Sequence, residues 1–247
     1  MHIFITGGTR GIGNGMVKEF LKRGHQVSFT GTNEKSFVNV IDLEGKYNTY
    51  ICDVRNIESI EEALKDAISK FGEIDIFINN AGVDQDRALL IDIDSENIKK
   101  VIDINVIGMI NGTKVALKEM IKQGHGYVYN MEGLGSDDRM IEQTIIYGSS
   151  KRLLRYFSNA VNKEMKDYEN IVIGTLSPGM VFTDLLLNNS TEESMKIMNI
   201  LGNTVEEVTP FLVENMLKKK QKIYWLTTWK VIKKFIKSIF VKPKKRG

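Results

Sequence analysis

The chain has 247 residues, a formal net charge of +3 and one cysteine, Cys52. This length suits a single domain with a large core. One cysteine excludes an intrachain disulfide, as expected for a reducing cytoplasm, and three scattered histidines give no basis for a metal site. No secretory signal precedes the first apolar segment and no apolar run is long enough to span a membrane, so we expect a cytoplasmic protein.

The chain opens with an apolar segment, residues 2–6, that predicts a buried strand. A glycine-rich turn follows, with Gly7, Gly11 and Gly13 in the pattern G-x-x-x-G-x-G, and apolar residues then recur at helical spacing. Strand, glycine turn and helix form the context of a dinucleotide site, because glycines admit the pyrophosphate and the helix N-terminus supplies N–H groups.

Strands and helices alternate along the rest of the chain. Strands are predicted near residues 2–6, 26–30, 48–51, 74–78, 125–130, 170–176 and 222–226. Helices are predicted near residues 11–23, 57–70, 95–121, 147–168 and 205–218. This order predicts an α/β fold, a single Rossmann-type doubly wound parallel sheet with helices on both faces. We expect this domain to cover residues 1–227, with a separate tail at 228–247.

Tyr147 and Lys151 are four residues apart in the segment Y-G-S-S-K, so a helix would place both on one face. An ordinary tyrosine has a pKa near 10, and a neighbouring ammonium lowers that pKa by stabilising the phenolate. The pair is therefore a candidate for proton transfer. The alternative is a surface tyrosine that packs over a lysine stem. The glycine turn at the start of the chain favours proton transfer over this alternative.

Six motifs in the right order resemble the short-chain dehydrogenase/reductase family over roughly residues 2–226. The matching segments are Thr6–Gly13, Asp53-Val54, Asn79–Gly82, Asn105, the Tyr147/Lys151 pair, and Ser177-Pro178-Gly179 with Thr183. The resemblance implies that Tyr147 is the general acid, that Lys151 lowers its pKa and bonds the nicotinamide ribose, and that Asn105 holds a water linking Lys151 to solvent. It also implies a homodimer or homotetramer acting on a small-molecule carbonyl or alcohol.

The resemblance places a nicotinamide cofactor on a defined set of residues. The expected cofactor-binding residues are Gly7, Thr9, Arg10, Gly11, Ile12, Gly13, Thr32, Asn33, Asp53, Val54, Asn80, Ala81, Gly82, Tyr147, Lys151, Pro178, Gly179, Val181 and Thr183. An acidic residue near the end of the second strand would repel a 2′-phosphate, but Thr30-Gly31-Thr32-Asn33 offers none. Arg10 can pair with a phosphate. The sequence therefore predicts NADP rather than NAD.

One position departs from the family. The family has a serine three residues after the asparagine that ends the fifth strand, and here that position is Gly133. Ser136 is the nearest hydroxyl that could replace it as a catalytic residue, whereas Glu132 would place an anion beside a developing oxyanion. This departure leaves a second function open, a dinucleotide-binding regulator or scaffold without turnover. Intact Asn105, Tyr147 and Lys151 favour the enzyme.

A narrower resemblance links the segments Asn130–Ser136 and Ser177–Leu187 to plant chlorophyll b reductases. Residues 183–203 are rich in leucine, isoleucine and methionine, and the corresponding segment covers the substrate in the resembled family. The alternative, of equal weight, is ordinary helix packing. The apolar character of the segment and the adaptability of methionine predict a hydrophobic ketone or aldehyde as substrate.

The tail is strongly basic. Residues 218–247 hold 12 basic and no acidic residues, and 34 minus those 12 leaves 22 basic beside all 31 acidic residues, a charge of −9 for the rest of the chain. Residues 228–241 predict an amphipathic helix with lysines on one half and large apolar side chains on the other. This pattern is typical of a helix that lies on an anionic membrane surface. The alternative is a helix packed on the enzyme body or on a second subunit, and nucleic acid is not expected as a partner.

Overall fold

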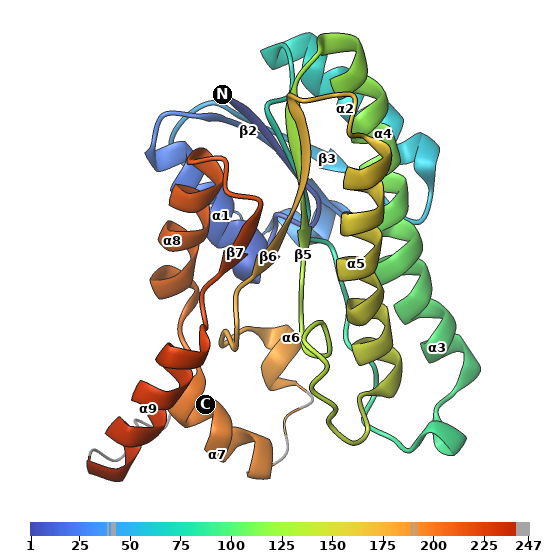
Figure 1. The fold of residues 1–247 in the computed structure, drawn as a ribbon. Coiled ribbons are helices and arrows are strands. Elements are labelled where there is room, and N and C mark those ends of the chain that lie inside the picture. Colours follow the sequence, from blue (N-terminus) through green and yellow to red (C-terminus); the bar gives the residue numbers. More distant parts are fainter. Residues whose placement is uncertain (39, 41–42, 189, 191, 241–247) are drawn as a thin grey trace.

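The computed structural model describes residues 1–38, 40, 43–188, 190 and 192–240. Within this part of the chain, seven parallel strands form one sheet in the order β3-β2-β1-β4-β5-β6-β7 (Figure 1). The strands are β1 (His2–Ile5), β2 (Gln26–Gly31), β3 (Tyr47–Ile51), β4 (Ile76–Asn79), β5 (Gly126–Met131), β6 (Ile171–Ser177) and β7 (Lys222–Tyr224). The predicted fold class is confirmed, and each predicted strand has a counterpart.

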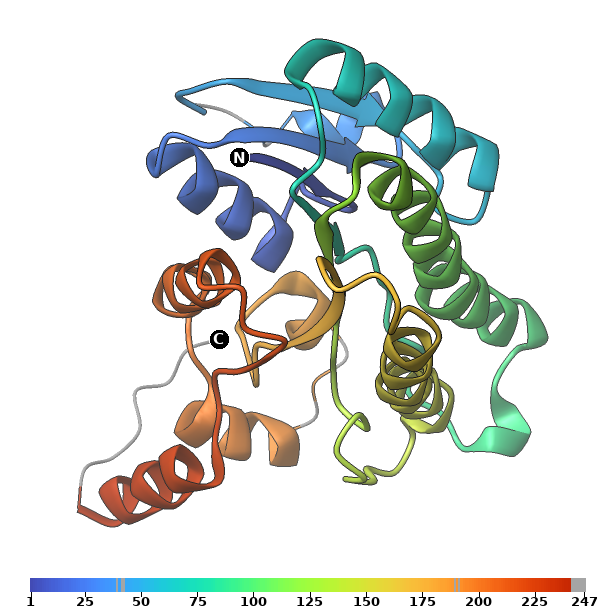
Figure 2. The same ribbon diagram turned by 45° about the horizontal axis from the view of Figure 1, so that its top comes forward.

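Helices cover both faces of the sheet, as Figure 2 shows. One face carries α1 (Gly11–Lys22) and α8 (Val205–Leu217), and the other carries α2 (Ile57–Phe71), α4 (Gly108–Gln123) and α5 (Ile145–Glu164). Side chains alternate along each strand, so Ile3 and Ile5 pack toward α1 and α8 whereas Phe4 packs toward α2 and α4. The central strands β1 and β4 are thus buried on both faces, which explains why their sequences are mostly apolar.

The single helix predicted over residues 95–121 is wrong in one respect. It consists of α3 (Ser95–Ile102), a π-helical turn (Asp103–Ile107) and then α4. Asn105 lies inside this turn and is 1% exposed. A π turn adds one residue to a helical turn and frequently occurs at functional sites. Apolar spacing cannot reveal it, because the residues on either side keep a helical pattern.

Two short helices fill the segment 183–203, and a third forms the tail. They are α6 (Asp184–Leu187), α7 (Glu192–Leu201) and α9 (Thr228–Phe240). The tail helix forms as predicted from residue 228, but Val241, its expected last residue, lies outside the described residues. In Figures 1 and 2, α9 lies beside α7 and projects from the body. No helix in the described ranges is long and apolar enough to cross a membrane.

Candidate active site

A cradle for an anion lies between β1 and α1. Gly7 and Gly11 have φ values of +66° and +54°, which favour glycine. A Cβ on Gly13 would lie only 2.2 Å from the Gly7 carbonyl oxygen, so any larger residue would close the turn. Arg10 is the N-cap of α1 and makes no side-chain cap. The first turn of α1 therefore faces a cavity with the geometry that receives a pyrophosphate.

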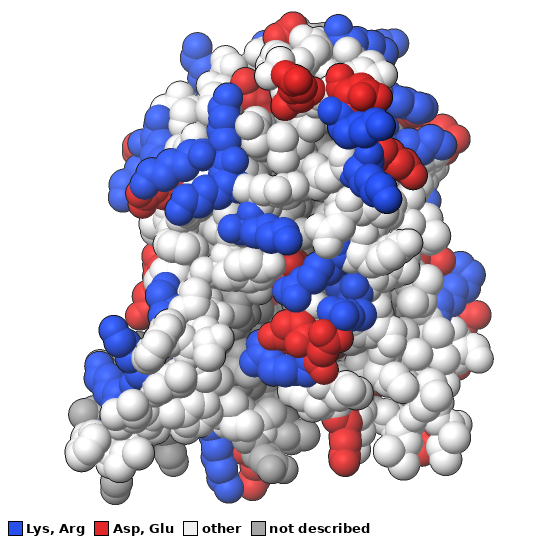
Figure 3. Space-filling view, viewed as in Figure 1, with Lys and Arg blue, Asp and Glu red and all other residues white. Residues whose placement is uncertain are grey.

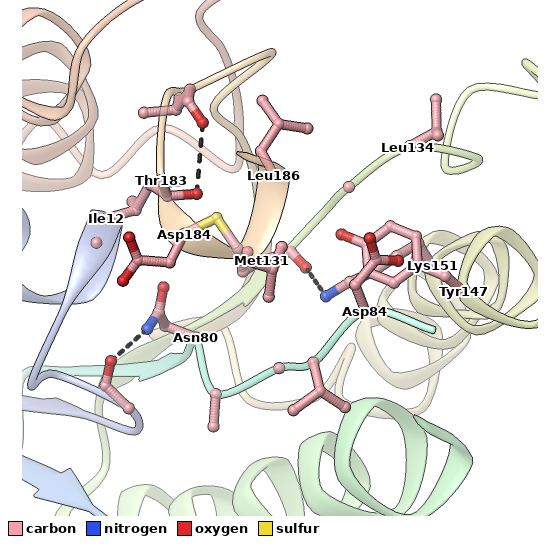
Figure 4. Close-up of a pocket in the computed structure, with 18 of the residues that line it drawn as sticks. Ile12, Asn80, Asp84, Met131, Leu134, Tyr147, Lys151, Thr183, Asp184 and Leu186 are labelled. Carbon is pink, nitrogen blue, oxygen red and sulfur yellow. Dashed lines mark hydrogen bonds between the residues drawn. The ribbon is translucent and has the colours of Figure 1, made fainter. Parts of the chain in front are cut away.

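Two loops lock the cradle in place. The Thr6 hydroxyl oxygen accepts hydrogen bonds from the backbone N–H groups of Asn80 and Ala81, both at 3.1 Å. The Asn80 side-chain amide donates back to the Gly7 carbonyl at 2.8 Å, as Figure 4 shows. The loops after β1 and β4 are therefore a single hydrogen-bonded unit. A bound dinucleotide would meet a preformed surface rather than two mobile loops.

The far end of the cradle carries both charges and hydroxyls. Thr32, Asn33, Lys35 and Ser36 line the same cavity as Arg10, beside the end of β2. Asn33 fixes this loop, because its side-chain oxygen accepts the Ser36 N–H at 3.0 Å. Lys35 and Ser36 were not predicted from the sequence. The only feature that could have indicated them is that they follow closely after the expected pair Thr32-Asn33.

The loop after β3 forms the opposite wall. Asp53 and Val54 line the cavity, and the Asp53 carboxylate pairs with the Arg55 guanidinium at 2.6 Å. Hydrogen bonds from the Arg55 side chain hold the pKa of the Asp53 carboxyl below its ordinary value. Asp53 therefore stays ionised and its side chain is already engaged by a neighbour.

The predicted catalytic pair lies on α5 and lines the cavity. Tyr147 and Lys151 both line it, and the Lys151 ammonium lies 5.7 Å from the centre of the Tyr147 ring. The ammonium donates to the Met131 carbonyl at 3.2 Å (Figure 4). Burial lowers the pKa of Lys151 to about 8, opposed by the Glu132 carboxylate. Glu132 is itself held by Arg155 at 2.8 Å.

The pKa of Tyr147 departs from its ordinary value in the opposite direction to the one expected from a neighbouring lysine. Burial and the Asp84 carboxylate raise it, and Arg87 opposes them only in part. Asp84 lines the same cavity as Tyr147, and both are labelled in Figure 4. Asp84 pairs with Arg87 at 2.9 Å, so the loop after β4 brings an ion pair close enough to influence the pKa of Tyr147. Sequence reasoning missed this pair, because nothing in its spacing marks it.

Asn105 approaches the pair from the π turn without lining the cavity. Its amide accepts from the Val83 N–H and donates to the Val83 carbonyl, each at 2.8 Å, and it also donates to the Ser150 hydroxyl at 3.2 Å. A Cβ on Gly82 would lie 3.3 Å from the Asn105 oxygen and 3.6 Å from the Lys151 nitrogen. Asn105 thus fixes the loop after β4 against α5, next to the lysine.

Gly133 and Ser136 occupy different places around Tyr147. A Cβ on Gly133 would lie 2.4 Å from the Tyr147 hydroxyl, so the tyrosine fills the space that a side chain would take. Ser136 is 2% exposed, and its hydroxyl donates to the Lys151 carbonyl at 3.0 Å while it accepts from the Gly133 N–H. To bond a substrate oxygen, Ser136 would have to leave the carbonyl to which it donates.

A further polar residue is hydrogen-bonded to the N-terminus of α5. Gln85 is fully buried, and its side-chain oxygen accepts the Tyr147 N–H at 2.8 Å while its amide donates to the Gln143 carbonyl at 3.0 Å. The N-cap residue Thr144 makes no side-chain cap, so Gln85 satisfies a first-turn N–H from another loop. Gln85 had no sequence signal beyond following the Asn79–Gly82 motif.

The loop after β6 closes the cavity. Pro178, Gly179, Val181 and Thr183 all line it, and a Cβ on Gly11 would lie 3.3 Å from the Thr183 methyl group. The cavity measures about 1340 Å³ and takes in every predicted site residue except Asn105. Its apolar arm is formed by Leu185, Leu186, Ile197, Met198 and Leu226. The segment 183–203 thus lines the cavity and also packs, since Met198 and Leu201 are buried.

The doubly wound sheet, the glycine cradle and the tyrosine–lysine pair define a dinucleotide-binding oxidoreductase. Residues 1–194 match the family of short chain dehydrogenases, and the chain belongs to this family. "Probable chlorophyll(ide) b reductase NYC1, chloroplastic" from Arabidopsis thaliana is 33% identical over 237 residues, covering 87% of this chain and 48% of the relative. The chain therefore spans about half the length of that relative.

Two further likenesses cover most of both chains. "Carbonyl reductase family member 4" from Xenopus laevis is 33% identical over 198 residues, covering 80% of this chain and 82% of the relative. A solved structure described as "The Closed form of serine dehydrogenase complexed with NADP+" superimposes with a TM-score of 0.81 at 22% identity, covering 93% of this chain and 96% of the other. The latter likeness concerns the fold alone.

Proposed function

We propose that this chain is an NADP(H)-dependent reductase that converts a hydrophobic ketone or aldehyde to an alcohol. The observation that supports it most is that Tyr147 and Lys151 line the same cavity as the glycine cradle. A scaffold would need the cradle but not a buried lysine beside a tyrosine. Keeping an ammonium so enclosed destabilises a fold, so a catalytic use explains its presence better than packing does.

Tyr147 is the general acid. Because its pKa is raised, the phenol is protonated at neutral pH and can give its proton to a carbonyl oxygen. A reduced nicotinamide bound in the cavity supplies the hydride that completes reduction at the carbonyl carbon. The Lys151 ammonium, 5.7 Å from the Tyr147 ring, then stabilises the phenolate that is left. Lys151 also serves as the donor to the cofactor ribose, as the family resemblance implies.

NADP(H) is favoured by the charges at the end of β2. Arg10 and Lys35 line the cavity there, while Glu34, the nearest acidic residue in the chain, lines a separate cavity with Phe37 and Thr49. A 2′-phosphate would therefore meet two cations and no carboxylate from this loop.

A bulky apolar carbonyl compound suits the rest of the cavity. The α6–α7 segment contributes leucine, isoleucine and methionine side chains, and methionine adapts to irregular shapes. The chlorophyll(ide) b reductase and carbonyl reductase names of the relatives support a reducible carbonyl. Ser136 remains a candidate to hold the substrate oxygen, although its bond to Lys151 favours a role in fixing α5.

The test compares Tyr147→Phe with Tyr156→Phe, an exposed position on the same helix. NADPH oxidation is followed with a panel of aliphatic and aromatic ketones and aldehydes. Tyr147→Phe should lower kcat by about 10²–10⁴-fold while NADPH binds nearly as well, and Tyr156→Phe should change neither. Near wild-type kcat in Tyr147→Phe would refute the assignment. NADPH binding without turnover of any carbonyl would favour the regulator or scaffold.

A further inference from the structure

The tail helix α9 is oriented with its polar side toward the body. Lys230 lies over the Trp225 ring, 3.7 Å from its centre, and Lys234 donates to the Leu201 carbonyl at 2.9 Å. The opposite side carries the large apolar residues, with Trp229 74% exposed and Phe240 81% exposed. This orientation is the reverse of the one expected for a helix that packs on the body through its apolar side.

The exposed side of α9 is continuous. Helical geometry places one row of apolar residues on it, bordered along one edge by the exposed Lys233 and Lys237. The row consists of Trp229, Ile232, Phe235, Ile236, Ile239 and Phe240, each more than 40% exposed. Figure 3 shows this projection as mostly white, with blue beside it. An uncovered apolar row bordered by lysines fits the boundary between acyl chains and headgroups.

Charge decides between an anionic lipid surface and a second copy of the chain. Residues 218–247 hold 12 basic and no acidic residues. Joining two such helices through their apolar rows would bring like charges together, which is unfavourable at short range. An anionic bilayer accepts the apolar row and attracts the lysines at the same time.

Lys234 connects α9 to the segment 183–203, part of which lines the cavity. Besides the Leu201 carbonyl, its ammonium reaches the Gly202 carbonyl at 3.3 Å and the Asn203 side-chain oxygen at 2.7 Å. Leu201 is the last residue of α7, whose Ile197 and Met198 line the apolar arm of the cavity. The same lysine therefore fixes the C-terminus of α7 to the tail helix. A cation is favourable at a helix C-terminus, because the helix dipole is negative there.

We propose that α9 binds an anionic lipid surface through its apolar row and that the Lys234 contacts transmit this binding to α7 over the cavity. The enzyme would then receive an apolar carbonyl substrate from the bilayer to which it is held. Lipid binding stands on the tail alone, whereas the effect on turnover rests on the proposed reductase function.

Co-sedimentation of the full chain with phosphatidylglycerol vesicles tests the binding. The protein should pellet with these vesicles at low salt, remain in solution with pure phosphatidylcholine vesicles, and be released at about 1 M salt, where charges are screened beyond about 3 Å. Ile236→Asp should weaken partitioning by at least roughly tenfold, whereas Ile236→Leu should bind as wild type. Lys237→Glu should weaken it more than Lys18→Glu, an exposed position on α1 with the same change in net charge.

Three results would overturn the proposal. Wild type that stays in solution with anionic vesicles at low salt excludes lipid binding. Concentration-dependent association that Ile236→Asp abolishes, in sedimentation without lipid, assigns the apolar row to a second copy. The link between vesicle binding and turnover is tested with Lys234→Met. This variant should pellet with anionic vesicles as wild type does, but its kcat/KM for a long-chain ketone should not rise when vesicles are added. A rise as large as that of wild type excludes transmission through Lys234. Vesicle binding is measured without substrate, so failure of the reductase function leaves the lipid result intact.

Discussion

Replacing Lys151 with methionine measures how strongly the enclosed ammonium destabilises the fold. Burial lowers the pKa of Lys151 from an ordinary 10.5 to about 8. Each pKa unit corresponds to about 1.4 kcal/mol, so the charged form at pH 7 costs the folded state about 3 kcal/mol. Methionine removes this cost but also the hydrogen bond to the Met131 carbonyl, worth about 1 kcal/mol. The cofactor-free variant should therefore be more stable than wild type by about 2 kcal/mol.

The direction of the pH dependence follows from the lowered pKa of Lys151. Below about pH 8 Lys151 is protonated in both the folded and the unfolded chain, and the full loss of stability caused by the buried charge is present in wild type. Between about pH 8 and the ordinary value of 10.5, the unfolded chain binds a proton that the folded protein has released. The stability contribution of Lys151 therefore rises with pH, and the advantage of the variant shrinks.

Urea unfolding of the cofactor-free proteins at about pH 7 and about pH 10 measures this difference. Lys163→Met, an exposed position on the same helix α5, is the matched control and should change stability by no more than about 0.5 kcal/mol at either pH. Lys151→Met should lose reductase activity at the same time, a trade of function for stability. A variant less stable than wild type at pH 7, or an advantage that does not fall with pH, would refute the reasoning.

Three further substitutions and one control probe the site. Gly133→Ala should lower kcat by up to about 10²-fold, because its Cβ displaces the Tyr147 hydroxyl. The control Gly148→Ala, whose Cβ would have its nearest neighbour 4.0 Å away, should keep kcat and stabilise α5 by about 0.5–1 kcal/mol in urea unfolding. Equal kcat values for the two variants would contradict this reasoning. Gln85→Leu should lower the free energy of unfolding by about 1–3 kcal/mol and reduce kcat more than it raises KM, and an unchanged kcat would show that Gln85 only stabilises. Arg10→Ala should reduce the preference for NADPH over NADH by roughly tenfold or more in kcat/KM, and an unaltered ratio would remove Arg10 from phosphate recognition.

The fold and the position of the glycine cradle could be predicted from the amino-acid sequence. Continuous apolar runs identified strands that are buried on both faces, and helical spacing after Gly13 identified α1. These features are local, because a strand or a glycine turn is specified by adjacent residues. The helix over 95–121 shows the limit, since its π turn at Asn105 leaves the surrounding spacing unchanged.

The contacts between these residues depend on the folded chain. Only the folded chain brings Gln85 to the N-terminus of α5, encloses Lys151 until its pKa falls to about 8, and fills the space above Gly133 with the Tyr147 hydroxyl. The tail shows the division clearly. Its sequence fixes two contrasting sides of a helix, but the Lys234 contacts with Leu201 decide that the apolar side faces outward. Burial and hydrogen-bond partners depend on segments distant in the chain, so local patterns cannot specify them.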